Sequence, residues 1–236
     1  METLSSIMLE LEAMGSEQTR KIHRKHGAPD NLFGVKVGDM KKIVKRIKKN
    51  HELSLALFDT GNSDAMYLAG LIGDEKKITE SQLQHWAENS SWHMVSEYTV
   101  PFVAAESPFA WPLSLAWIQS PHEKIASSGW STLSRYVAMV PDEALDICAL
   151  KSLVTQIEKT IHTSDNRVRY TMNGFLIALG GYVLPLTDFV NKTAVSIGEL
   201  KVDMDGTACQ VPDVVAYIVK MEKAGVLGKK RKTARC

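Results

Sequence analysis

The sequence contains few cysteines and no long hydrophobic run. Its three cysteines, Cys148, Cys209 and Cys236, include no CxxC pair, so neither a disulfide framework nor a zinc knuckle is predicted and reduced thiols are expected. No stretch approaches the ~20 apolar residues of a transmembrane helix. The N-terminal METLSSIMLELEAM carries acids where a signal peptide is basic. These absences predict a cytoplasmic, globular protein.

Sequence signatures of nucleotide-dependent and hydrolytic enzymes are also absent. HExxH, G-x-S-x-G, Walker A and Rossmann glycine patterns do not occur. His23 and His26, like His93 and Glu97, have a spacing that places two ligands on one helical face, but a metal site needs a third ligand and usually a fourth. No other residue is indicated, so we expect neither a metal nor a cofactor.

Most of the sequence follows the helical period, and strand signals are nearly absent. Between Val37 and Asn50 one face is apolar, with Met40, Ile43, Val44 and Ile47 at helical spacing. Only 200–204 has the pattern of a brief extended segment. We expect about a dozen helices joined by short loops.

Four polar caps recur along the chain, each ahead of a helix with bulky residues on one face. They lie at Ser63, Ser90, Ser120 and Thr163, with spacings of 27, 30 and 43 residues. Capping boxes are expected at Thr79 with Gln82 and at Ser120 with Glu123. Between successive caps there is room for one partner helix. The pattern favours helical hairpins repeated in one α-solenoid domain over 1–236, with a closed bundle as the alternative.

The net charge of +1 hides strong local segregation of charge. Residues 35–50 hold seven Lys or Arg against one Asp, and the final GKKRKTARC holds five bases and no acid. Lys41, Lys45 and Lys48 lie opposite the apolar face of their helix, where they either bind an anionic partner or form a solvated surface. The basic tail is expected to be mobile and to make sequence-independent phosphate contacts, or none.

The order of four segments carries a resemblance to a known family. RKIHRKHGAPDNLFGVKVGDMKKIVKRIKKNH, SDAMYLAGLIGD, SSWHMVSEYTVPFV and AWIQSPHEKIASSGWSTL, within 20–181, resemble the HEAT-like-repeat DNA alkylation repair superfamily, whose enzymatic members are AlkD-type alkylpurine DNA glycosylases. The resemblance implies an all-α superhelix, curved, with a basic concave groove that holds duplex DNA. Residues 200–236 have no counterpart in the glycosylases and suggest a separate branch, with an atypical capping segment.

The resemblance also assigns roles to individual positions of the groove. It places Trp92 on an aromatic wall and puts Ser96 where the glycosylases have a catalytic aspartate. Ser127 or Ser128 stands in place of an arginine, and Phe175 in place of a second tryptophan. The groove is thus expected to keep its shape and to lack the charged pair that stabilises an oxocarbenium-like transition state.

A substitute carboxylate is present one position further along the same helix. Glu97, with His93 and Trp92, forms the candidate catalytic set, although Glu97 is otherwise expected at the groove rim. The resemblance and the charge pattern together suggest DNA-backbone contacts from the basic side chains Lys41, Lys45, Lys48, Lys124, Arg135, Arg167 and Arg169. Cys209 is expected to be a free, buried thiol.

Three functions remain compatible with the sequence. The first is binding of duplex DNA, alkylated or otherwise damaged DNA included, by a protein whose glycosylase centre is lost or altered. The second is an active glycosylase with a rewired site, and the third is a helical scaffold that binds protein on its concave face. Salt-dependent binding of plain duplex separates the first two from the third.

Overall fold

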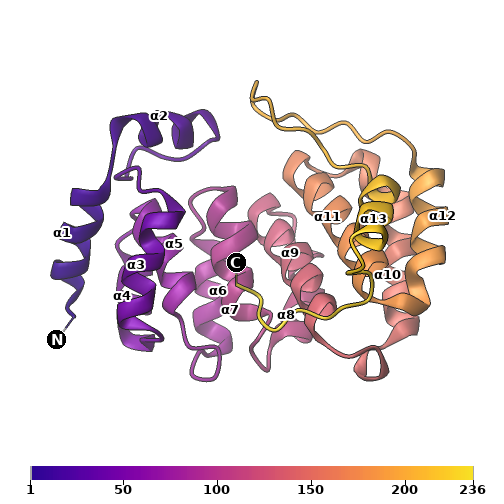
Figure 1. The fold of residues 1–236 in the computed structure, drawn as a ribbon, viewed down its shortest axis with the longest axis horizontal. Coiled ribbons are helices and arrows are strands. Elements are labelled where there is room, and N and C mark those ends of the chain that lie inside the picture. Colours follow the sequence, from indigo (N-terminus) through magenta and orange to yellow (C-terminus); the bar gives the residue numbers. More distant parts are fainter. Residues whose placement is uncertain (1, 236) are drawn as a thin grey trace.

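The computed structural model describes residues 2–235, which form a row of helices stacked side by side in a curved superhelix (Figure 1). No strand occurs within this range. The all-α solenoid predicted from the sequence is thereby confirmed. The helices are α1 (Leu4–Met14), α2 (Glu17–Lys25), α3 (Val37–Ile47), α4 (His51–Asp59), α5 (Ser63–Ile72), α6 (Glu80–Glu88), the π-helix η1 (Val95–Thr99), α7 (Val100–Ala104), α8 (Ala110–Trp117), α9 (Glu123–Met139), the 3-10 turns η2 (Asp142–Ala144), η3 (Ile161–Thr163) and η4 (Leu184–Leu186), α10 (Ile147–Thr160), α11 (Asn166–Tyr182), α12 (Thr187–Ile197) and α13 (Val214–Lys223).

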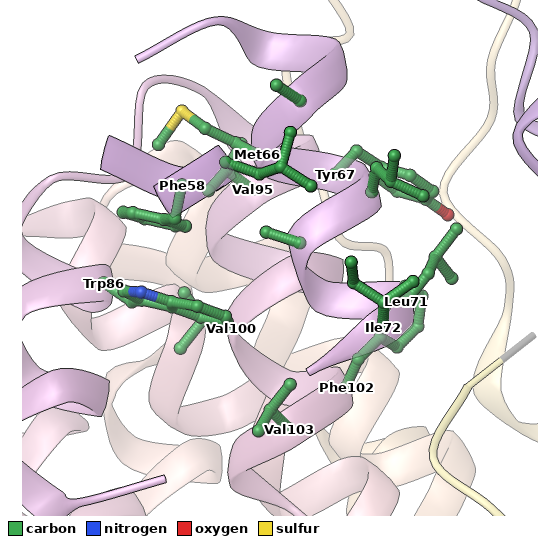
Figure 2. Close-up of a cluster of buried hydrophobic side chains, with 14 of the residues drawn as sticks. Phe58, Met66, Tyr67, Leu71, Ile72, Trp86, Val95, Val100, Phe102 and Val103 are labelled. Atoms are coloured by element: carbon green, nitrogen blue, oxygen red, sulfur yellow. The ribbon is translucent and has the colours of Figure 1, made fainter. Parts of the chain in front are cut away.

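The hydrophobic core consists of two buried clusters that adjoin between α8 and α9. In the first, the rings of Phe58 and Trp86 are stacked, with centroids 4.6 Å apart and an interplanar angle of 6° (Figure 2). Val95 and Val100 belong to the same cluster and are fully buried. Burial of these side chains anchors η1 and α7, and with them the tryptophan helix that the sequence singled out.

Small residues allow the inner helices to approach closely. A Cβ added to Gly70 of α5 would lie 2.8 Å from the Cα of Thr99, and one added to Gly129 of α9 would lie 2.9 Å from the backbone nitrogen of Ile118. Any larger side chain at either position would push neighbouring helices apart. At Gly129 the small Ser-Ser-Gly stretch therefore serves close packing.

Helices begin near the sequence signals, but the four recurring polar residues do not act as N-caps. Asn62 caps α5 ahead of Ser63, and the hydroxyls of Ser90 and Thr163 donate to the carbonyls of Trp86 and Thr160.

Thr79 caps α6 in a capping box with Gln82, as predicted. The capping box expected at Ser120 is wrong, because α9 begins at Glu123 and the Ser120 hydroxyl accepts a hydrogen bond from the backbone N–H of His122. A hydroxyl that accepts this bond in a local turn is not available to accept one from the N–H of Glu123 in a capping box.

The longest apolar stretch of the described chain is around α11 and α12. No single helix within residues 2–235 is long and apolar enough to cross a membrane. α11 and the segment Leu184–Ile197 reach the length and apolar composition of a membrane span only when taken together, and the chain bends by 115° between them. α11 itself packs against α9, α12 and α13.

Residues 228–235, here called the basic strap, run back along the C-terminal ends of the inner helices (Figure 1). The backbone N–H of Gly228 donates to the carbonyl of Gly181 in α11, and that of Arg231 donates to the carbonyl of Ala138 in α9. The Lys230 ammonium donates to the carbonyl of Val137. The strap therefore satisfies carbonyl groups that helix ends leave without partners.

Arg235 forms the far end of the basic strap. Its guanidinium donates to the carbonyls of Gly70 at 3.2 Å and Gly73 at 2.6 Å, at the end of α5, and it lies 3.4 Å from Glu75 and 3.3 Å from Glu106. The expectation of a mobile tail is wrong for these residues. Basic side chains are stabilised here because the C-terminal ends of helices carry partial negative charge.

Candidate functional site

The edge opposite the strap is built from the N-terminal ends of the inner helices. The Ser63 hydroxyl, at the start of α5, lies 3.5 Å from the Ser91 hydroxyl, just ahead of η1. The Lys124 ammonium of α9 donates to the carbonyl of Ser91 at 3.0 Å, and the backbone N–H of Arg167 in α11 donates to the Glu123 carboxylate at 2.7 Å. Helix ends that carry partial positive charge are thus gathered along one edge.

Two hollows open beside Trp92 on this edge. The aromatic hollow has a volume of about 260 Å³ and is lined by His23, His26, Trp92, His93, Met94, Tyr98, Arg167, Tyr170, Met204, Asp205 and Cys209. The adjoining serine hollow, of about 360 Å³, is lined by His26, Gly27, Ser91, Trp92, His93, Ser96, Glu123, Lys124, Ser127, Asn166, Arg167 and Asp205. Trp92, His93 and Arg167 belong to both, so the two hollows form one continuous site.

The helix that carries Trp92 widens into the π-helix η1, where the backbone N–H of Val100 donates to the carbonyl of Val95 five residues earlier. Pro101 has no N–H to donate to the carbonyl of Glu97, which interrupts the α-helical ladder at this turn. In the wider turn Ser96 lines the serine hollow, while the Glu97 side chain is buried and directed to Arg167. The π-helix thus allows both neighbours to serve the same site.

Glu97 and Arg167 form a buried, two-bond ion pair. The Arg167 Nε donates to Oε1 of Glu97 at 2.7 Å, and Nη2 donates to Oε2 at 2.5 Å. Burial raises the pKa of the Glu97 carboxyl, and the facing Arg167 guanidinium opposes that rise. The guanidinium also lies over the ring of Tyr170, 4.4 Å from its centroid. Both carboxylate oxygens therefore accept hydrogen bonds from Arg167, and the charge of Glu97 is balanced within the protein.

Two histidines of the aromatic hollow, His93 and His23, have lowered pKa values. Burial, with smaller contributions from Arg167 and His26, lowers the pKa of His93 to about 4. Burial likewise lowers the pKa of His23. The two rings flank Trp92, with centroids 5.0 Å and 5.5 Å from the tryptophan ring. Among residues 2–235 no group of three or more His, Cys, Asp or Glu is placed to hold a metal ion.

One side of the aromatic hollow is formed by α2, which is held in place by a buried aspartate. The Asp64 carboxylate, 3% exposed, accepts backbone hydrogen bonds from Phe33, Gly34 and Val35 at 2.6, 2.8 and 3.0 Å. These residues lie in the loop that follows α2. A carboxylate that accepts three backbone N–H groups fixes such a loop firmly, so α5 positions His23 and His26.

The opposite side is formed by residues 200–212, which rise beyond α12 (Figure 1). The Asn166 amide donates to the carbonyl of Asp203 at 2.8 Å, and the Arg169 guanidinium donates to that of Lys201 at 2.8 Å. No strand forms in this segment. Cys209 is exposed and lines the aromatic hollow, so the expectation of a buried thiol is wrong. Its neighbours are loop residues, which leave the side chain uncovered.

The predicted basic residues fall into three groups. Lys124 and Arg167 line the serine hollow. Arg135 lies over the rings of Tyr98 and Phe102, at 5.2 and 5.1 Å from their centroids, and Arg169 holds the 200–212 segment. Lys41, Lys45 and Lys48 of α3 are exposed and lie outside both hollows.

Two residues expected to line the groove do not reach it. Phe175 is fully buried in the second core cluster, with its ring 5.4 Å from that of Trp130. The Ser128 hydroxyl is also buried and donates to the carbonyl of Lys124 four residues earlier. The assignment of Phe175 and Ser128 to the groove lining is therefore wrong. α11 and the middle of α9 are packed on nearly all sides, so helical periodicity alone did not identify the face that meets the groove.

Sequence reasoning missed several residues that form the aromatic hollow. His26, Tyr170 and Met204 line it, but none was proposed as part of this site. The three-residue spacing of His23 and His26 was visible, and Tyr170 follows Arg167 at the same spacing, which places each pair on one helical face. Only the superhelix brings these faces to Trp92.

A larger hollow, of about 900 Å³, adjoins the site at the N-terminal ends of α9 and α11. Its lining includes the carboxylates of Glu88, Glu123 and Asp165 against one lysine, Lys124. With three carboxylates against one lysine, this hollow is the part of the edge least favourable for phosphate. The chemistry that suits a nucleic acid therefore concentrates around Trp92.

Comparisons with known proteins agree with this architecture. A family model described as "DNA alkylation repair enzyme" matches residues 7–200. "Uncharacterized protein Lmo0209" of Listeria monocytogenes is 35% identical over 226 residues, which cover 93% of this chain and 97% of that protein. "Uncharacterized protein Lin0241" of Listeria innocua is 34% identical with the same coverage.

A solved structure is also similar to this chain over its whole length. It is described as "A new family of proteins related to the HEAT-like repeat DNA glycosylases with affinity for branched DNA structures", with a TM-score of 0.91, 35% sequence identity and 100% coverage of both chains. The match thus includes the 200–212 segment and the basic strap, which lie beyond the family model. The chain belongs to the DNA alkylation repair enzyme family, as a HEAT-like-repeat solenoid.

Proposed function

We propose that this protein binds branched DNA along the edge formed by the N-terminal ends of its inner helices, and that it does not excise bases. The observation that carries the proposal is the Glu97–Arg167 ion pair. It lies next to Ser96, the position where the resemblance puts the catalytic carboxylate of the glycosylases. A site arranged in this way can hold DNA but lacks the group that drives cleavage.

The absence of excision follows from electrostatics. Departure of a purine leaves positive charge on the sugar, and a nearby carboxylate stabilises it; loss of one such group costs about 10²–10³ in rate. Ser96 carries no charge, and both oxygens of Glu97 accept hydrogen bonds from Arg167. The negative charge of Glu97 is therefore balanced within the protein rather than offered to a ligand.

Binding of DNA is supported by charges on this edge and by unpaired lysines on α3. Helix N-terminal ends attract phosphate groups, and Lys124 lies at the rim of the serine hollow. On α3, Lys41, Lys45 and Lys48 form no ion pair among the described residues, whereas Lys42 and Arg46 are paired with Asp39 and with Glu2 and Glu10. Unpaired lysines on one helix face suit a polyanion.

Branched rather than continuous duplex DNA is favoured by the shape of the site and by the solved relative. α2 and the 200–212 segment stand on either side of the aromatic hollow, and a branch point offers unstacked bases between two such walls. The relative is described as having affinity for branched DNA structures. Straight duplex DNA, with or without alkylated bases, is the alternative ligand.

Competition binding tests the proposal. A labelled three-way junction is bound to the protein and displaced by unlabelled junction, or by duplex of the same length and charge, across a salt series. We expect displacement by junction at a concentration at least tenfold lower than by duplex, and a log–log salt slope of about −0.9 per phosphate contact. Equal displacement by duplex would remove the preference for branches. No binding at low salt would favour the protein-binding scaffold instead.

Single-turnover release of 7-methylguanine and 3-methyladenine from methylated duplex tests the second part. We expect no release above the uncatalysed rate from the native protein. Release that disappears in Glu97→Gln would show a rewired glycosylase and overturn the proposal. Ser96→Asp is the informative partner variant, because activity gained there would show that only the carboxylate is missing.

A further inference from the structure

We infer that the aromatic hollow captures one unpaired base at the branch point of the bound DNA. The inference rests on the proposed binding of branched DNA and adds the group that is recognised. Three features of the hollow support it: its size and aromatic walls, its lack of available positive charge, and two buried nitrogen atoms without partners.

The size of the hollow suits a single planar ring system. Pockets for drug-sized ligands have volumes of about 300–1,000 Å³, and this one has about 260 Å³. Trp92, Tyr98 and Tyr170 supply aromatic side chains from two separate elements, and Met204 lies opposite on the 200–212 segment. Base stacking on aromatic side chains tolerates any base, because every base has a π face.

The charges in the hollow favour a base over a phosphate group. Arg167, the positively charged side chain in its lining, already directs two hydrogen bonds to Glu97. His23 and His93 are neutral because burial lowers the pKa of each. Phosphate binding depends on positive charge or free N–H groups, and both are better supplied by Lys124 and the helix ends outside the hollow. The base and its phosphate would therefore be held at separate places.

Two polar atoms in the wall lack hydrogen-bond partners. Trp92 is 7% exposed, and its indole Nε1 is buried without a hydrogen-bond partner among residues 2–235. The Nδ1 atom of His23 is also buried without a hydrogen-bond partner in this range. Nearly all buried polar groups in proteins are hydrogen-bonded, and those that are not call for an explanation. Both side chains line the hollow, and a small rotation of either ring on capture would bring the indole N–H to an acceptor on the base and the imidazole nitrogen to an acceptor or a donor.

The test compares two three-way junctions that differ only at the branch point. One carries unpaired thymines there, and the other carries abasic residues with the same phosphates. For the native protein we expect binding to be about 10-fold weaker when the bases are missing, since stacking of one base is worth about that much. For Trp92→Leu the two junctions should bind equally. Trp111→Leu, which changes a half-buried tryptophan of α8 outside the hollow, should keep the 10-fold difference.

Tyr170→Leu is a second variant in case Trp92→Leu does not fold, and it should also reduce the difference. Replacement of one thymine by 5-iodouracil adds a direct readout, with a photo-crosslink expected to Trp92 or Tyr170. Equal native affinity for both junctions, with the preference over duplex intact, would overturn base capture and leave the proposed function standing. If the native protein does not prefer the junction over duplex, both base capture and the proposed function are overturned. Equally tight binding of free thymidine would show that the hollow serves a small molecule, and would overturn capture from DNA.

Discussion

Arg167 and Glu97 are 70 residues apart in the sequence, yet their side chains are joined by two hydrogen bonds, Nε to Oε1 at 2.7 Å and Nη2 to Oε2 at 2.5 Å. The pair connects α11 to η1, two elements that both pack against α9. The Glu97 side chain is 4% exposed and that of Arg167 is 19% exposed. The pair therefore ties neighbouring repeats together at the floor of the site.

Removal of one partner should destabilise the protein more than removal of both. Glu97→Ala leaves the Arg167 guanidinium without its partner, and we expect the free energy of unfolding to fall by about 3 kcal/mol, the lower end of the range for a broken buried pair because Arg167 is partly exposed. The double variant Glu97→Leu with Arg167→Leu should regain a large part of that loss. Urea denaturation of the three proteins measures both effects. If the double variant is as unstable as Glu97→Ala, the charge of Arg167 is not the cause.

Stability should depend on pH through His93. The folded state lowers the pKa of His93 from 6.5 to about 4, so it binds the proton less readily than the unfolded chain does. The contribution is fully present above pH 6.5 and is lost as the pH falls toward 4, by up to roughly 3 kcal/mol at 1.36 kcal/mol per pKa unit. His93→Gln should flatten the difference between urea midpoints at pH 7.5 and 4.5. His122→Gln is the control for the substitution itself, because His122 is exposed and forms no ion pair among residues 2–235.

The basic face of α3 should contribute to DNA affinity in a sequence-independent way. Lys41→Glu, Lys45→Glu and Lys48→Glu combined should weaken binding to every DNA tested and reduce the steepness of the salt slope by about 0.9 for each of these lysines that binds a phosphate group. Lys76→Glu with Lys77→Glu, beyond the opposite end of α5, should leave the slope unchanged. An unchanged affinity in the triple variant would exclude α3 from the DNA-binding surface.

The basic strap should detach when its last arginine is shortened. Arg235→Ala removes the hydrogen bonds to Gly70 and Gly73 and the ion pairs with Glu75 and Glu106. We expect trypsin to cleave between Lys229 and Lys232 at least about tenfold faster, and the free energy of unfolding to fall by about 1–3 kcal/mol. Arg235→Lys keeps the charge but not the planar fork, so an intermediate effect is expected. Cleavage at the native rate in Arg235→Ala would show that the remaining hydrogen bonds hold the strap unaided.

Much of the fold was predictable because it depends on interactions close in sequence. Helical periodicity and the Thr79 cap act within one or two turns, and they led correctly to a solenoid. The π-helix was not predicted, although Pro101 was visible, because a proline is compatible with several local distortions. The basic strap lacks any periodic signal, and its order comes only from contacts with distant helix ends.

The sequence predicted the location of the site better than the roles of its individual residues. Trp92, Ser96 and His93 lie together at the expected groove, since the resemblance located their helix. Phe175 was assigned to the wrong face because α11 is apolar around most of its circumference. The pairing of Glu97 with Arg167 could not be derived from either helix alone, because their separation depends on the summed rotations of the intervening repeats.

The basic strap also affects the order in which the molecule is assembled. Successive repeats contact mainly their neighbours, so α1 to α9 can fold while later residues are still being synthesised. The Arg235 hydrogen bonds to Gly70 in α5 and to Gly73 just after it span 165 and 162 residues. Closing so long a loop is slow and occurs last. Until residue 235 has emerged from the ribosome, the carbonyls of Gly70 and Gly73 must be satisfied by water. In the nascent protein, the helix that follows Trp92 therefore folds before Arg235 forms its hydrogen bonds with the early repeats.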